Sequence, residues 1–194
     1  MQDVRIASAE EAALVDQAIA GDREAFGELY ERHVRRVYRY LLYMAKDVDV
    51  AEDLTEETFL QALAAIHRYQ RRGVPFVAWL LRIAHNLQLN LNGRRAQRSV
   101  PLVHEDQEGV VGSPELFLQD RASAERLMQV VQTLNEDQRQ VLILRFIEGL
   151  SYADTARILG KSVGAVRVAQ YRALRALRQK LEDGDLGQNS ASSG

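Results

Sequence analysis

The chain has 194 residues, of which 27% are charged and 46% hydrophobic, a composition typical of one large globular domain or two small ones. It contains no cysteine, which excludes disulfides, thiolate metal sites and a cysteine nucleophile. The formal net charge of −2 hides an alternation, because residues 61–100 carry 7 basic side chains and no acid, and residues 138–181 carry 9 against 2. Arginines make up 22 of the 25 cations, and their planar fork suits phosphate. The basic blocks therefore indicate nucleic-acid surfaces, although solvated helix faces would give the same pattern.

No segment is expected to enter a membrane. Residues 1–12 include two glutamates and no apolar core, unlike a signal peptide. The longest uncharged apolar stretch, residues 74–81, is far shorter than the ~20 residues that cross a bilayer. The sequence predicts a cytoplasmic protein.

Helical periodicity dominates the first half of the chain. A capping box at Ser8 opens a predicted helix that ends near Gly21. Asp22 caps the next predicted helix, whose apolar positions recur at three and four residues. Two further helices are predicted over about residues 50–67 and from Pro75, a favourable first helical residue, to about residue 93.

The composition changes after residue 98. Two prolines, two glycines and three acids crowd into residues 99–114, the signature of a flexible linker. Four more helices are predicted, and a small, polar tail that is expected to be disordered follows them. The four helices of this second half are predicted near 121–134, 136–148, 152–159 and 163–181. The predicted fold is thus all-α, with two small helical domains at 8–98 and 119–182. A linker at 99–118 joins the domains, and a disordered tail follows at 183–194.

Residues 151–166 have the spacing of a helix-turn-helix. Ala156 permits close helix approach, Gly160 makes the turn, and Val166 packs into the angle between the helices. A plain helical hairpin would show the same spacing. The net charge of +7 over residues 138–181 favours the DNA-binding interpretation.

The second helix of this motif is the predicted recognition helix, whose N-terminal end touches base edges in the major groove. Its periodicity separates two faces. The outward face is predicted to hold Ala165, Arg167, Val168, Tyr171 and Arg172, and the inward face Val163, Val166, Gln170, Leu174, Leu177 and Leu181.

Residues 69–86 interleave aromatic side chains and arginines around a Gly/Pro loop. Surfaces of this kind bind single strands, because aromatic walls stack or clamp bases and arginines follow the backbone. Alternatively, Phe76 and Trp79 are core residues of an amphipathic helix.

A cluster of acidic residues lies on one predicted helix. Asp53 and Glu57 are one turn apart, as are Glu56 and Leu60, and like charges at this spacing are unfavourable unless a basic partner meets them. A paired-carboxylate active site is the alternative, but no metal-ligand spacing or convergent base accompanies it, and the four histidines form no i, i+4 pair. We therefore predict an acidic surface with no catalytic residue, metal or cofactor.

Taken together, these segments resemble the extracytoplasmic-function group of bacterial sigma factors over about residues 10–182. The motifs that carry the resemblance stand at residues 26–30, 51–59, 79–86 and 149–166. Four ordered motifs around a linker are far more specific than a lone helix-turn-helix.

The resemblance implies a subunit that binds core RNA polymerase and directs it to promoters, and that an anti-sigma factor holds inactive. It implies that Asp53, Glu56, Glu57 and Leu60 dock on the clamp helices of the largest polymerase subunit. The melted −10 strand would contact Tyr69, Arg71, Arg72, Phe76, Trp79, Arg82 and Asn86. The −35 duplex would contact Arg145, Tyr152, Ala165, Arg167, Val168, Tyr171 and Arg172.

Several positions depart from the pattern of the family. Glu56 stands where glutamine is common, and His85 and Asn90 replace other residues near the −10 motif. Ala165 and Val168 suggest fewer hydrogen bonds and more methyl contact in the −35 groove. A stand-alone helix-turn-helix regulator would explain residues 138–181 equally well, but it would leave the acidic face and the 69–86 segment without a role.

Overall fold

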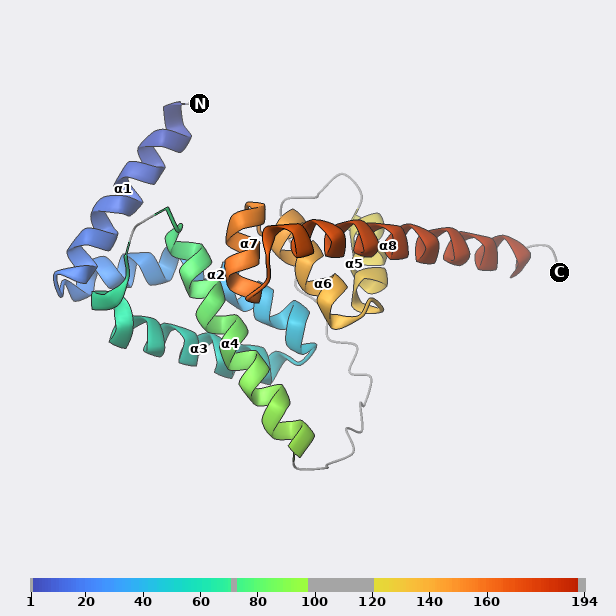
Figure 1. Ribbon diagram of the computed structural model, residues 1–194, viewed down its shortest axis with the longest axis horizontal. Helices are drawn as coiled ribbons and strands as arrows, with labels where there is room; N and C mark the ends of the chain where they lie inside the picture. Colours follow the sequence, from blue (N-terminus) through green and yellow to red (C-terminus); the bar gives the residue numbers. More distant parts are fainter. Residues whose placement is uncertain (1, 71–72, 98–120, 192–194) are drawn as a thin grey trace. The chain divides into compact units, whose positions relative to one another are not determined.

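The computed structural model describes residues 2–70, 73–97 and 121–191, and every element in these ranges is helical (Figure 1). The predicted all-α fold is therefore confirmed. The chain divides into two compact units, residues 1–107 (unit 1) and 108–194 (unit 2). The whole predicted linker, residues 99–118, lies outside the described residues, as do Arg71 and Arg72.

Unit 1 contains α1 (Gln2–Ile19), α2 (Arg23–Ala45), α3 (Val48–Ala65), the 3₁₀ turn η1 (Ile66–Arg68) and α4 (Phe76–Gln97). Aspartates cap two of these helices, because an aspartate carboxylate readily accepts hydrogen bonds from the free N–H groups of the first helical turn. The Asp22 carboxylate accepts from the backbone N–H groups of Glu24 and Ala25, and Asp47 accepts from Val50. The predicted cap at Ser8 is wrong, because α1 begins at Gln2 and Ser8 lies inside it.

The core of unit 1 is built around α2, which packs against α1, α3 and α4. The largest fully buried side chains of α2 are Tyr40, Tyr43, Leu29 and Leu41, and α4 adds Leu80 and Leu81. A buried polar contact joins the two helices, since the Tyr40 hydroxyl lies 3.2 Å from Nδ1 of His85. This contact gives two buried polar groups a hydrogen-bond partner.

Unit 2 contains α5 (Arg121–Gln132), α6 (Glu136–Leu142), the π turn η2 (Ile143–Ile147), α7 (Tyr152–Leu159) and α8 (Val163–Ala191). The helix predicted over residues 136–148 is therefore α6 continued by a π turn. Gly160 ends α7 with φ 61°, a left-handed conformation that glycine adopts without strain, and its N–H donates to the Ala156 carbonyl. The helix α8 continues through residues 183–191, where the sequence predicts a disordered tail.

The inward face predicted for α8 is partly wrong. Val166 and Ala173 are fully buried, but Leu174 is 40% exposed. Val163 and Leu181 are exposed to a similar extent. Ala173 packs against Val131, Leu134 and Leu142, and Leu177 is partly buried beside them. Leu174 is not part of this cluster.

Candidate functional site

The predicted acidic face lies on α3. Asp53, Glu56, Glu57 and Leu60 are all exposed, and Leu60 retains 55% of its accessible surface. The intervening side chains point the other way, since Leu54, Thr55, Thr58 and Phe59 are buried. The structure thus brings the four predicted side chains together on one surface.

An apolar groove of about 640 Å³ lies beside this face, between α2 and α3. Its wall includes an edge-to-face pair, Tyr30 and Phe59, with ring centroids 4.8 Å apart. Tyr30 and Leu63 are 39% and 45% exposed, and sequence reasoning missed both. The signal for Leu63 was its place three residues after Leu60. The groove is lined by Phe26, Tyr30, Val34, Arg35, Tyr38, Glu52, Thr55, Glu56, Phe59, Leu60 and Leu63.

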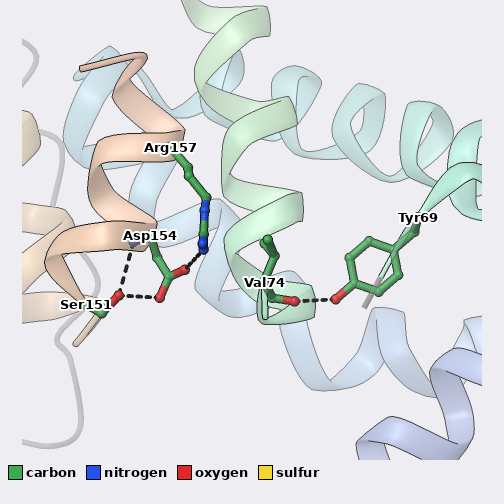
Figure 2. A network of polar contacts seen from close by, with 5 residues as sticks. All are labelled: Tyr69, Val74, Ser151, Asp154 and Arg157. Atoms are coloured by element: carbon green, nitrogen blue, oxygen red, sulfur yellow. Dashed lines mark hydrogen bonds and ion pairs between the residues drawn. The ribbon is translucent and has the colours of Figure 1, made fainter. Parts of the chain in front are cut away.

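The aromatic residues of the 69–86 segment pack on one another. Tyr69 and Phe76 are buried and Trp79 is half-buried, with ring centroids 5.0 to 5.6 Å apart. The Tyr69 hydroxyl donates to the Val74 carbonyl at 2.6 Å, two residues before α4 begins (Figure 2). Phe76 also contacts the ring of His33, 5.5 Å away. Phe76 is therefore a core residue, as the alternative interpretation of the sequence held.

The exposed part of this segment is the polar face of α4. Arg82 and Asn86 are exposed, and Trp79 precedes them by three and seven residues. These spacings place the three side chains on one side of the helix. Among the described residues, this face is the accessible portion of the predicted single-strand surface, and Arg71 and Arg72 lie outside them.

The start of the helix-turn-helix is fixed by a polar network (Figure 2). The Ser151 hydroxyl accepts from the Asp154 backbone N–H at 3.1 Å and donates to the Asp154 carboxylate at 2.5 Å. Arg157 donates to the other carboxylate oxygen at 2.8 Å. A serine at the N-cap and an acid three residues later satisfy each other's hydrogen-bonding groups. This arrangement sets the direction in which α7 leaves the loop.

The predicted recognition face on α8 is exposed as expected, with Tyr171 at 68% and Val168 at 50%. Ala165, Arg167 and Arg172 are exposed as well. Arg145 and Tyr152, also predicted to contact DNA, are only half-buried and do not belong to α8. The Arg145 guanidinium lies 4.0 Å from the centroid of the Tyr152 ring.

Two pKa shifts belong to the scaffold beneath these surfaces. The polar contact with His33, whose Nε2 lies 3.3 Å from a carboxylate oxygen of Glu11, lowers the pKa of Glu11, and burial opposes this effect. Burial lowers the pKa of Arg139, whose guanidinium donates to the carbonyls of Gln132 and Leu134 where α5 ends. Both groups join neighbouring helices.

Within the described ranges, no group of three or more histidine or acidic side chains is arranged to hold a metal ion. No described helix is long and apolar enough to cross a membrane.

Unit 2 contains a helix-turn-helix formed by α7 and α8. Its second helix, α8, exposes Arg167, Val168, Tyr171 and Arg172. This fold and this surface define a protein of the helix-turn-helix class.

Comparison with known proteins narrows that class. The family model for sigma-70 region 2 matches residues 29–99, and that for sigma-70 region 4 matches residues 124–177. The chain is 41% identical over 172 residues to the ECF RNA polymerase sigma factor BldN of Streptomyces coelicolor, covering 88% of this chain and 65% of BldN. It is 34% identical over 175 residues to the ECF RNA polymerase sigma factor SigD of Mycobacterium tuberculosis, covering 87% of this chain and 82% of SigD.

A solved structure agrees with these matches. The sigma factor RpoE in complex with the anti-sigma factor NepR from Bartonella quintana gives a TM-score of 0.60 at 27% identity, covering 81% of this chain and 96% of RpoE. The chain therefore belongs to the extracytoplasmic-function sigma factors of RNA polymerase. Proteins of this family direct promoter-specific transcription and are not catalysts in themselves. The resemblance seen in the sequence is confirmed, and the stand-alone regulator is not favoured.

Proposed function

We propose that this chain binds core RNA polymerase through unit 1 and contacts promoter DNA through both units. The observation that carries the proposal is the presence, in one chain, of an acidic face beside an apolar groove on unit 1 and an arginine-bearing recognition helix on unit 2. A duplex-binding regulator needs only the second surface.

The α3 face and its groove are the proposed docking site for the clamp helices of the largest polymerase subunit. Asp53, Glu56 and Glu57 offer carboxylates to a basic partner, and such complementary charges steer association. Leu60 and Leu63 offer apolar area that is exposed in the free protein. An apolar centre with a charged rim is the usual composition of a protein interface.

The proposed −10 surface is the exposed face of α4. Trp79, Arg82 and Asn86 are accessible to an unpaired strand, with a ring for stacking, a cation for phosphate and an amide for base edges. Tyr69 and Phe76 support this surface from below, because both are buried against Trp79. Their effect on the strand is therefore exerted through Trp79 and the shape of the loop.

The proposed −35 surface is the N-terminal half of α8. Arg167 and Arg172 supply guanidinium groups for guanine edges or phosphates, while Ala165, Val168 and Tyr171 supply apolar contact with thymine methyl groups. This division follows the family pattern expected from the sequence.

An anti-sigma factor is a further proposed partner. The similar RpoE structure contains the anti-sigma factor NepR, and the exposed groove and acidic face of unit 1 are the surfaces that such a partner must cover to block polymerase. The proposed function places the protein in the cytoplasm, where polymerase works.

Reconstitution with core polymerase tests the proposal. The full chain and core together are expected to give run-off transcripts from specific promoters, and neither component alone is expected to do so. A protein that binds duplex DNA by itself but yields no specific transcript with core would be a stand-alone regulator, and the proposal would be wrong.

A further inference from the structure

Three side chains meet where the π turn, α7 and α8 converge in unit 2. The guanidinium carbons of Arg145 and Arg167 lie 4.0 Å and 5.2 Å from the centroid of the same aromatic ring, that of Tyr152. Both distances fall within the range of cation–π attraction, about 6 Å. One ring therefore holds two cations that would otherwise repel each other.

The first of these cations is committed to the fold. Nε of Arg145 donates to Oε1 of Gln170 at 3.1 Å, and its Nη1 donates to the carbonyl of Leu150. Arg145 thus ties the π turn to the loop before α7 and to the inner flank of α8, and it remains only partly accessible. With its donors used in this way, Arg145 is suited to fixing the Tyr152 ring in place.

The second cation faces outward. Arg167 is exposed in the first turns of α8, the part of a recognition helix that reaches base edges. A free arginine side chain samples many rotamers, and ordering it on binding costs entropy. Contact with a fixed ring restricts those rotamers before DNA arrives, and the neighbouring Arg145 charge increases the local attraction for an electronegative acceptor.

We propose that Tyr152 is a positioning residue: it acts on sequence recognition through Arg167, whose guanidinium it holds ready for a base edge in the duplex, rather than by touching DNA itself. The proposal rests on the function proposed for unit 2 and deepens it. It assigns specificity at one site to a pair of residues on different helices, Tyr152 on α7 and Arg167 on α8.

The probe is a promoter library whose −35 segment is randomised, selected with holoenzyme assembled from the full chain and core polymerase. Wild type, Tyr152→Phe, Tyr152→Leu, Arg167→Ala and the Leu/Ala double variant are compared by the preference for each base at each position. Arg167→Ala is expected to reduce the preference at one or two adjacent positions by about 5- to 150-fold, the range for losing a bidentate base contact. Tyr152→Leu is expected to reduce it at the same positions by about two- to fivefold, and Tyr152→Phe to leave it unchanged.

The double variant distinguishes positioning from direct contact. If Tyr152 acts through Arg167, Tyr152→Leu has no further effect once Arg167 is alanine, because coupled residues are not additive. Additive losses, or losses at positions that Arg167→Ala leaves intact, would overturn the proposal. A wild-type holoenzyme that enriches no sequence would instead refute the function proposed for unit 2.

A second variant covers the case in which Tyr152→Leu perturbs the fold. Pentafluorophenylalanine in place of Tyr152 keeps the shape of the ring but reverses its quadrupole, so it removes the attraction for a cation while retaining the packing. It is expected to reproduce the loss of base preference at the Arg167-dependent positions. Retention of full preference by this variant would show that the attraction does not position Arg167.

Discussion

Leu60 gives the sharpest test of the docking surface. It is 55% exposed on α3, so docking can bury at most about half of its side chain. Full burial of a leucine is worth about 1.5–3 kcal/mol, and the exposed fraction therefore corresponds to about 0.8–1.6 kcal/mol of binding free energy. Leu60→Ala is expected to raise the Kd for core polymerase by at most about 4- to 15-fold.

The matched control is Leu89→Ala, which removes the same atoms from a side chain that is 46% exposed on α4, outside the proposed docking face. Both substitutions are expected to change the free energy of unfolding by less than about 0.5 kcal/mol, because neither side chain lies in the core. Fluorescence anisotropy with labelled full-length chain and core polymerase measures the two Kd values. Equal binding by Leu60→Ala and wild type, or equal weakening by both variants, would refute the assignment of α3.

Three further substitutions test the scaffold. Tyr69→Phe is expected to lower the stability of unit 1 by about 0.5–1.5 kcal/mol in urea unfolding, because the hydrogen bond to the Val74 carbonyl is lost while ring packing remains; an unchanged midpoint would contradict this. Glu11→Gln is expected to reduce the acid sensitivity of unit 1. The folded-state pKa of Glu11 is lowered from 4.5 by contact with His33, so this stabilisation is present above pH 4.5 and is lost as the pH falls through the folded-state pKa. If the unfolding midpoints of wild type and Glu11→Gln fall equally between pH 5 and 3, Glu11 does not contribute to the acid sensitivity of unit 1. Asp154→Ala is expected to destabilise unit 2 by about 1–3 kcal/mol in thermal melting, because its serine and arginine partners lose a buried acceptor; a loss below 0.5 kcal/mol would show that the network contributes little.

Local features of the fold could be predicted from the sequence because they depend on residues close together in the chain. Asp22 caps α2, and Gly160 ends α7 in a left-handed conformation. Each depends on the chemistry of one side chain acting on the nearest backbone groups. The acidic face of α3 follows in the same way from the helical spacing of its residues.

Features that depend on tertiary packing could not be predicted. Periodicity placed Leu174 in the core of unit 2, but its neighbour Ala173 is the buried residue. Only the neighbouring helices determine which side of an ambiguous stripe is covered. The burial of Tyr69 and Phe76 has the same origin, since aromatic residues are equally suited to stacking on bases and to filling a core. The cation–π cluster at Tyr152 joins residues from three elements, and no sequence spacing indicates it.

The charge pattern acquires a physical meaning once the two units are separated. On α3, Asp53 and Glu57 lie one turn apart on an exposed face, and like charges at this spacing cost a helix about 0.2–0.5 kcal/mol. A basic partner removes that cost on binding. The repulsion therefore destabilises the free helix slightly and favours binding to a basic partner over a neutral or acidic one. On α8, Arg172 and Arg175 are exposed and three residues apart, so their like charges also repel until an anionic duplex approaches. Because both surfaces belong to one chain, binding at one raises the effective concentration of the other at its own site, and neither needs high affinity alone. The overall charge of −2 is then the balance of several acidic and basic surfaces, each repulsive within itself and suited to a partner of the other sign.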